Sequence, residues 1–204
     1  MMDLYSYSYT AAGDFKVINS DLFNQIPESD ARRDWFTTSP YYAAWKGSPL
    51  ALLPTGKFHS DRSSEIMGDR SWESDIHFMR IEECYLIAAE AEAREGHTAS
   101  AATYLKAILD NRDETTAASL ASMTNDQLLD EIFFNWRVEM WGEGKSLQTF
   151  KRFKKNMTCP ANDPKYGVAA NGSARVINYD SKEVVFAIPN QELQYNSNMK
   201  DADQ

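Results

Sequence analysis

The pattern of hydrophobic and polar positions changes at about residue 79. From Met79 onward, the stretch IEECYLIAAEAEARE places apolar residues at helical spacing, and Gly96 is expected to end this helix. A second helical pattern extends from about Thr98 to Asn111. We therefore expect two antiparallel helices that are alanine-rich where they meet and are joined by a tight glycine turn, as in a tetratricopeptide-type hairpin.

The first predicted helix is apolar around most of its circumference. Leu86, Ala89 and Ala93 lie opposite a wide apolar stripe, so only a narrow polar strip remains, made of Glu83, Glu90 and Arg94. Such a helix is expected to pack between neighbours, as in an α-solenoid. The wide stripe consists of Ile81, Cys84, Tyr85, Ile87, Ala88 and Ala91.

A third helix is predicted after a Ser/Thr/Ala-rich linker at residues 113–123. Thr124 and Gln127 have the spacing of a capping box, which satisfies backbone donors at a helix start. The apolar residues that follow recur at steps of three and four, namely Leu129, Ile132, Phe133, Trp136 and Met140. The sequence therefore predicts a second helical hairpin.

The end of this third helix is marked by two glycines. Gly142 and Gly144 are expected to stop it, and Ser146 is expected to cap a short fourth helix that carries Leu147, Phe150 and Phe153.

The remaining segments are irregular. Residues 1–78 contain several prolines and many aromatic residues, and they predict a loop-rich lobe with only short elements. Residues 156–180 predict a long Gly/Pro/Asn-rich loop, and Pro189 is expected to open a short helical turn near the end. We therefore divide the chain into an irregular, aromatic-rich lobe, residues 1–78, and a helical region, residues 79–204.

Composition and charge exclude several classes of protein. The chain has 204 residues, 43% of them hydrophobic, and suits one globular domain or a domain plus a long irregular lobe. A formal charge of −9 argues against nucleic-acid binding, which requires a basic face, and against a polybasic membrane-surface helix. No run of 18 apolar residues and no signal peptide is present, so the sequence suggests either a cytoplasmic protein or a piece of a longer one.

Residues with metal-binding or redox chemistry are scattered. Cys84 and Cys159 form no CxxC motif and are interpreted as thiols, with a disulfide between them as the alternative. His59, His77 and His97 are too far apart in the sequence to suggest a metal site or a catalytic triad. Because phosphate-loop and hydrolase motifs are also absent, we expect no cofactor and no metal.

The stretch NWRVEMWGEGKSLQTFKRF, residues 135–153, sets charged residues among large apolar ones. Arg137 lies beside the apolar stripe, so we expect it to be half-buried and paired with Glu143 as a structural clamp between helices. Two other interpretations are a ligand site and a catalytic pair of Glu139 and Glu143, as in glycoside hydrolysis. The clamp is preferred, because glutamates four residues apart are common on helices.

Three blocks of sequence resemble the C-terminal part of the SusD/RagB family. The first is HFMRIEECYLIAAEAEAREG, with Arg80 before an acidic, alanine-rich helix, and the last is VVFAIPNQELQYN. The middle block is EIFFNWRVEMWGEGKSLQTFKRF, in which Arg137, Glu139, Met140, Glu143, Gly144, Phe150 and Arg152 match the pattern. This block departs from the pattern at Ser146 and Thr149, where the family commonly has Arg and Asp. Looser matches, Asp30-Ala-Arg32 and Lys57-Phe58, lie upstream of all three blocks.

The resemblance implies an all-α fold with tetratricopeptide-like helical hairpins and an irregular, loop-rich lobe, residues 1–78, that faces the ligand. It also implies a non-catalytic protein that captures glycans or other small nutrients on the outer surface of the outer membrane of a Bacteroidetes cell. The expected partner is a SusC-like TonB-dependent transporter. The lipid anchor and signal peptide that the family carries are not in this sequence, which would correspond to the C-terminal part of such a protein.

Glycan binding requires flat aromatic rings and polar side chains that bond hydroxyl groups. The predicted lobe supplies aromatic residues, and we expect Trp35, Tyr41, Tyr42 and Trp45, around Pro40, to form a shallow ligand-binding groove. The alternative function is a helical-repeat scaffold that binds another protein. An enzyme acting on glycans is a third hypothesis, disfavoured because no acid/base pair stands out in the sequence.

Overall fold

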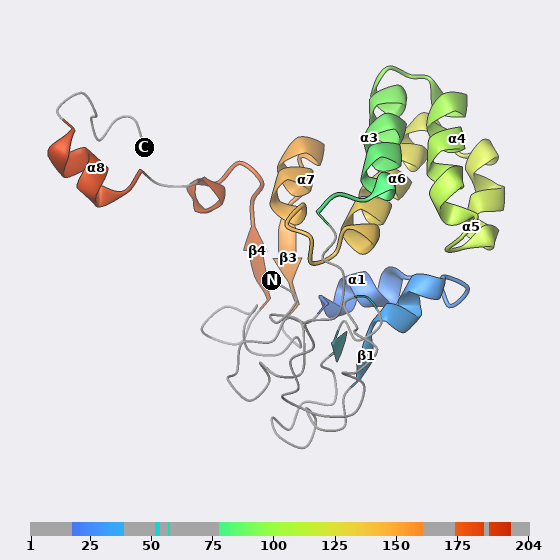
Figure 1. The fold of residues 1–204 in the computed structure, drawn as a ribbon, viewed down its shortest axis with the longest axis horizontal. Coiled ribbons are helices and arrows are strands. Elements are labelled where there is room, and N and C mark those ends of the chain that lie inside the picture. Colours follow the sequence, from blue (N-terminus) through green and yellow to red (C-terminus); the bar gives the residue numbers. More distant parts are fainter. Residues whose placement is uncertain are drawn as a thin grey trace.

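The computed structural model describes residues 18–38, 52–53, 57, 78–160, 174–185 and 188–196. The described part is dominated by helices, with two short two-stranded antiparallel sheets (Figure 1), so the all-α prediction is confirmed. In chain order the elements are α1 (Ser20–Gln25), η3 (Ala31–Trp35), β1 (Thr37–Thr38), β2 (Leu52–Leu53), α3 (Ile81–Arg94), α4 (Thr98–Leu109), α5 (Glu114–Ser119), η4 (Leu120–Ser122), α6 (Asn125–Glu139), α7 (Ser146–Phe153), β3 (Met157–Cys159), β4 (Arg175–Ile177), η5 (Lys182–Val184) and α8 (Asn190–Tyr195).

Helices α3 and α4 form the predicted hairpin. Gly96, in the turn between them, has a φ of +80°, a left-handed conformation that other residues adopt only with strain. Ala89 and Ala93 on α3 and Ala101 on α4 are fully buried, which allows the two backbones to approach closely. The hairpin therefore forms where the alanine pattern predicts it.

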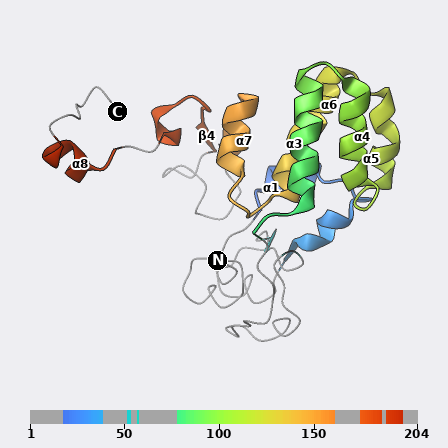
Figure 2. The ribbon, with the colours of Figure 1, turned by 45° about the horizontal axis from the view of Figure 1, so that its top comes forward.

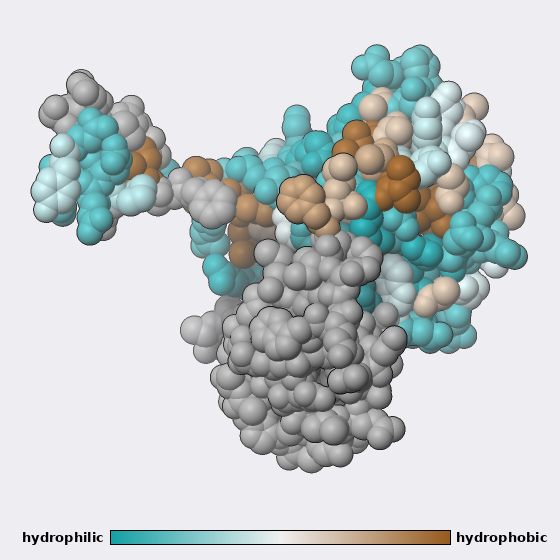
Figure 3. All heavy atoms as spheres, in the orientation of Figure 1, coloured by the Kyte–Doolittle hydropathy of each residue, from teal (hydrophilic) through white to brown (hydrophobic). Residues whose placement is uncertain are grey.

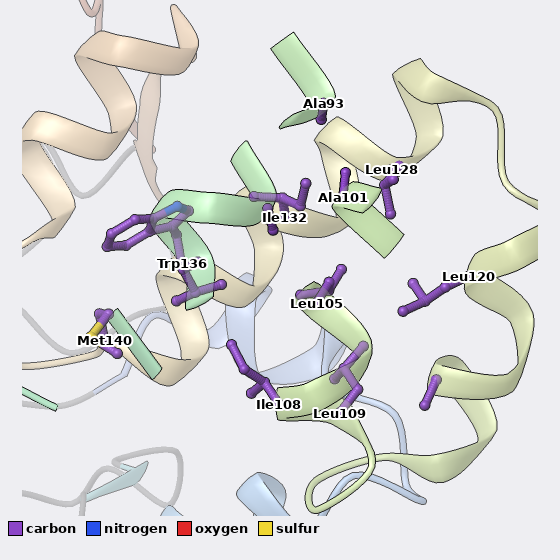
Figure 4. Packing of buried hydrophobic residues seen from close by; sticks show 13 residues of the cluster. Ala93, Ala101, Leu105, Ile108, Leu109, Leu120, Leu128, Ile132, Trp136 and Met140 are labelled. Atoms are coloured by element: carbon purple, nitrogen blue, oxygen red, sulfur yellow. The ribbon is translucent and has the colours of Figure 1, made fainter. Parts of the chain in front are cut away.

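Helix α6 packs across this hairpin and completes the main core (Figure 4). It begins with the predicted capping box: Gln127 N–H donates to the Thr124 hydroxyl, and Thr124 N–H donates to the Gln127 side chain. Leu128, Ile132 and Trp136 follow one face of the helix into the core. Burying each of these large side chains stabilises the fold by about 2 kcal/mol.

The segment between the hairpin and α6 is structured, so the prediction of a linker at residues 113–123 is wrong. It forms α5 and η4, and Asp113 caps α5 by accepting a hydrogen bond from Thr116 N–H. Ala117 and Leu120 are buried in the main core. Two buried residues within a polar stretch are too few to produce a recognisable helical period.

A second, smaller core attaches the described N-terminal elements to α6. Ile18, Leu22, Ile26 and Phe36 pack with Val138 of α6. The side chain of Asn19 caps α1. The proposed division of the chain at residue 78 stays a prediction, but the described elements before that residue share a core with the helices.

The wide apolar stripe of α3 does not pack as predicted. Ile81 is 65% exposed and Ile87 is 54% exposed, and Cys84 and Tyr85 are also exposed. The buried face is instead the one that carries Leu86, and apolar residues gather on the surface over α3 (Figure 3). Both faces of this helix are apolar, and hydrophobic periodicity alone could not identify which one faces the core.

Three further details differ from the prediction or refine it. Helix α7 has Lys145 at its N-cap, with no side-chain cap, so Ser146 is the first helical residue rather than the cap. The predicted loop at 156–180 contains an antiparallel pairing of β3 with β4, in which Thr158 lies opposite Val176. Pro189 stands immediately before α8, as predicted.

Candidate functional site

The corner between α6 and α7 places a group of charged residues in the interior. Gly142 and Gly144 have φ values of +78° and +77°, so the chain can reverse direction within a few residues. A Cβ at Gly144 would meet nothing within 4 Å, so glycine is needed there for its backbone conformation rather than for space. The turn leaves Glu139 and Glu143 on the same side, where they meet residues from distant parts of the chain.

Glu139 is the centre of this group. Its carboxylate is fully buried and bonds three arginines: Arg80 at 2.8 Å, Arg112 at 3.2 Å and Arg32 at 3.3 Å. Burial alone would raise the pKa of this carboxyl, but the hydrogen bond from Arg112 and the charges of Arg32 and Arg112 outweigh it and lower the pKa to about 2. Glu139 is therefore an anion throughout the physiological range.

Glu143 pairs with Arg80 and Lys57. The Arg80 Nη2 and Lys57 Nζ atoms lie 2.8 Å and 2.7 Å from its Oε1 atom. Burial opposes its charge, but the bond from Arg80 and the charge of Lys57 together lower the pKa of Glu143. Burial opposes the charge of Arg80 as well, but its hydrogen bonds to Glu143 and Glu139 raise the pKa of Arg80 above its ordinary value.

Lys57 also binds the end of helix α6. Its ammonium donates to the carbonyl oxygens of Glu139 and Trp141, at 2.6 Å and 2.7 Å. Helix C-terminal carbonyls carry partial negative charge, so a cation is favourable there. Burial is nevertheless the largest influence on Lys57 and lowers its pKa to about 8 from 10.5.

The group, which we call the Glu139 cluster, is balanced in charge. Asp30 and Glu82 complete it, because Asp30 pairs with Arg32 at 2.6 Å and Glu82 pairs with Arg112 at 3.1 Å. Four cations then face four carboxylates, so the buried charges compensate one another. The members are Asp30, Arg32, Lys57, Arg80, Glu82, Arg112, Glu139 and Glu143.

The predicted clamp between Arg137 and Glu143 is wrong. The Arg137 side chain points instead toward two aromatic rings: its guanidinium lies 5.2 Å from the Phe150 ring centroid and 5.5 Å from the Phe133 ring centroid. Burial lowers its pKa, and only a longer-range attraction to Asp21 opposes this. Glu143 lies on the other side of the α6 end, because the intervening turn carries it toward Arg80.

Some of the residues that pair with Glu139 and Glu143, in place of Arg137, could be recognised in the sequence. Arg32, Lys57 and Arg80 belong to blocks that resemble the SusD/RagB pattern. Arg112 and Glu82 were missed. Arg112 lies in the turn after α4, outside any helix, so hydrophobic periodicity gave no signal for it.

A cleft of about 840 Å³ lies between α3 and α7, a size typical of small-molecule sites. The two helices that form its walls stand next to each other in Figure 2, with α6 behind them. Trp136 of α6 and Ile87 and Ala91 of α3 supply apolar lining, and Gln148 of α7 supplies an amide.

Apart from Glu143, which belongs to the Glu139 cluster, the charged residues of this cleft are paired with one another. Glu90 accepts two hydrogen bonds from Arg152, at 2.7 and 2.9 Å, and one from Arg94 at 2.9 Å. Lys145 lies 2.7 Å from Glu83. Arg152 lies over the Trp136 ring, 5.0 Å from its centroid. Glu90 and Arg152 thus hold α3 and α7 together across the cleft.

Of the predicted ligand residues, only Trp35 lies within the described part of the chain. It is half-buried, packs against the second core, and has Lys57 and Arg112 at 5.2 and 5.6 Å from its ring. Much of its surface is therefore used in packing. Tyr41, Tyr42 and Trp45 lie outside the described residues, so the groove remains a prediction.

Within the described ranges, neither the cysteines nor a metal-binding group adds chemistry to the site. Cys84 and Cys159 are both thiols, as predicted. Within the described ranges, no group of three or more His, Cys, Asp or Glu residues could hold a metal ion. None of the helices in those ranges is long and apolar enough to cross a membrane.

Comparison with known proteins identifies the family. The model of the SusD family matches residues 28–203, which is most of the chain. The chain belongs to the SusD family. The resemblance seen in three separate sequence blocks is therefore confirmed.

Solved structures agree at the level of the fold. A structure described as a SusD-like carbohydrate binding protein from Bacteroides vulgatus ATCC 8482 superposes with a TM-score of 0.58 at 20% sequence identity. The match covers 98% of this chain and 46% of that one, so the chain spans less than half of the length of this solved relative. No curated protein matches the sequence.

Proposed function

We propose that this chain takes part in the non-catalytic capture of carbohydrate for uptake. The observation that carries the proposal is the match of the SusD family over residues 28–203. The described fold adds support, since a carbohydrate-binding protein of the same family shares it. The acidic surface charge also suits a neutral ligand better than a nucleic acid.

The proposal includes a place and a partner. The captured glycan, or another small nutrient, is transferred to a SusC-like TonB-dependent transporter at the outer surface of the outer membrane. A lipid anchor, as the family resemblance implies, would hold the protein there. Affinity purification of a tagged full-length protein from its native membrane, with the transporter absent from the eluate, would contradict the partnership.

A binding role without catalysis fits the chemistry of the two glutamates. A general acid in glycoside hydrolysis needs a raised pKa, whereas the pKa of Glu139 is about 2 and that of Glu143 is lowered. Both carboxylates are engaged by cations. We therefore expect Glu143→Gln to affect stability and no hydrolysis.

The ligand contacts proposed from the sequence are Trp35, Tyr41, Tyr42 and Trp45. A stacked ring contributes a few kcal/mol to binding at most. Calorimetric titration of Trp45→Ala with an oligosaccharide identified on a glycan array tests the groove. Trp35→Ala is expected to lose stability as well, because Trp35 packs against the second core.

One experiment separates the three classes of function. The purified chain is applied to a glycan array, and the glycans that bind are then incubated with it and analysed for cleavage products. Binding with no cleavage supports the proposal. Cleavage that is lost in Glu143→Gln would indicate an enzyme, and no binding to any glycan would contradict carbohydrate capture.

The alternative function is a helical scaffold that binds a protein. It is favoured by the exposed apolar face of α3, which carries Ile81, Tyr85 and Ile87. Exposed apolar patches of this kind commonly mark interaction surfaces. This alternative predicts that the chain binds no glycan and that Ile81→Glu, on the same exposed face but outside the cleft, abolishes binding to a protein partner.

A further inference from the structure

The cleft between α3 and α7 contains a buried polar group with no partner. Trp136 is 5% exposed and lines the cleft, and among the described residues nothing accepts a hydrogen bond from its indole Nε1 atom. Buried donors are nearly always satisfied in folded proteins, because the lost hydration must be replaced. The exception calls for an acceptor from outside the described residues.

We propose that this cleft binds an uncharged sugar unit, one oxygen of which accepts the Trp136 indole N–H. The inference rests on the proposed function and adds to it a second site, made of residues other than the predicted groove residues. Trp136 is otherwise enclosed by the main core, so the cleft is the side from which a ligand oxygen can reach it. Arg152 lies over the face of the ring and keeps its pair with Glu90, so the ligand oxygen approaches the in-plane N–H at the ring edge.

The charges of the cleft select a neutral ligand. Of the acidic lining residues, Glu83 pairs with Lys145, and Glu90 pairs with Arg94 and Arg152. The third, Glu143, belongs to the Glu139 cluster and is bound by Arg80 and Lys57. An ionic ligand would have to break one of these pairs to obtain a counter-charge, whereas a sugar hydroxyl would not.

The rest of the lining suits a sugar ring rather than a purely apolar molecule. Ile87 is 54% exposed and Ala91 is exposed beside it, so α3 offers a small apolar wall to the C–H face of a ring. Gln148 on the opposite wall is exposed, and its amide both donates and accepts hydrogen bonds. An apolar ligand would leave the Trp136 N–H and this amide without partners.

The test uses the indole N–H as its own reporter. In a ¹⁵N-labelled chain, the five tryptophans give separate indole signals, and Trp136→Phe identifies the one from Trp136. The probes are neutral hexasaccharides of glucose, xylose and mannose, with trigalacturonic acid as a charged comparison. We expect a neutral probe to shift the Trp136 indole signal saturably and the charged probe to leave it in place.

A pair of matched variants tests the location. Ala91→Phe places a ring inside the cleft, and Ala107→Phe makes the same change on an exposed position of α4 that does not line it. Ala91→Phe should weaken binding by at least about tenfold and Ala107→Phe should bind like the parent. Thermal unfolding of both variants checks that the fold is retained.

The possible failures are distinguishable. If a neutral hexasaccharide binds by calorimetry while the Trp136 signal stays fixed and Ala91→Phe binds normally, the cleft is not the site but carbohydrate capture stands. A stronger response to trigalacturonic acid would overturn the neutral specificity. If no hexasaccharide binds while the glycan array gives a hit, this inference is contradicted and carbohydrate capture stands; if the array also gives none, both are contradicted.

Discussion

Replacing Glu139 with glutamine tests the central interaction of the fold. The side chains have nearly the same shape, so Glu139→Gln removes the charge without creating a cavity. Arg32, Arg80 and Arg112 would then share a neutral amide, and its NH₂ group would face their N–H donors. The expected result is a large loss of stability.

The magnitude follows from the pKa of the carboxyl. Each pKa unit corresponds to about 1.4 kcal/mol, so a pKa that falls from 4.5 to about 2 on folding stabilises the ionised protein by about 3 kcal/mol. Removing one partner of a buried ion pair costs about 3–5 kcal/mol in other proteins, a range that includes this value. We therefore expect Glu139→Gln to lower the free energy of unfolding by about 3 kcal/mol or more.

The measurement is urea denaturation at pH 7, followed by far-ultraviolet circular dichroism. Asp130→Asn is the matched control, since it removes an acid from the same helix whose partner, Lys155, lies 2.9 Å away at the surface. That exposed pair should contribute less than about 1 kcal/mol. Equal midpoints and slopes for Glu139→Gln and the parent would refute the assigned role of the cluster.

The pH dependence gives a second check on the same residue. The pKa of Glu139 is lowered in the folded chain, so its stabilisation is fully present above pH 4.5 and is lost as the pH falls toward about 2. The acid limb of the stability curve of the parent should therefore be steeper in this range than that of Glu139→Gln. Parallel curves would contradict the lowered pKa.

Three further predictions concern single residues. The pKa of Lys57 falls from 10.5 to about 8 on folding, so the folded chain releases this proton first and the parent should gain stability between pH 8 and 10.5. Lys57→Met should lose this gain, and a curve of stability against pH that the substitution leaves unchanged would contradict the prediction. Arg137→Met should cost less than about 2 kcal/mol in urea denaturation, because Arg137 contacts the rings of Phe133 and Phe150 and, within the described part of the chain, no carboxylate. A cost above about 3 kcal/mol would indicate a buried ion pair. Gly144→Ala should cost about 1–2 kcal/mol through its positive φ alone, measured by thermal unfolding, and a neutral effect would refute this.

The sequence predicts the helices well where its signals are local. The capping box at Thr124 and the glycine turn at Gly96 depend on residues within one or two turns, and both appear in the structure as predicted. The linker prediction failed because α5 is held by an Asp113 cap and by Ala117 against the main core. Neither contact produces a periodic pattern.

The charged cluster was harder to predict because its contacts join distant segments. Arg137 is the nearest basic residue to Glu143 toward the N-terminus, and sequence proximity suggested that they pair. The partners of Glu143 are Lys57 and Arg80, the latter 63 positions away along the chain. Only the family pattern marked these residues, since propensity and periodicity say nothing about which distant charge completes a pair.

The span of the Glu139 cluster has a consequence for the folding kinetics. Its bonds connect positions separated by 27, 59, 82 and 107 residues, through Arg112, Arg80, Lys57 and Arg32. Closing such long loops is entropically costly, and a half-assembled cluster would leave buried charges without partners. The cluster is therefore expected to assemble after the α3–α4 hairpin, late in folding. Substitutions in it should chiefly accelerate unfolding and leave the folding rate almost unchanged, so the cluster determines how long each folded molecule survives.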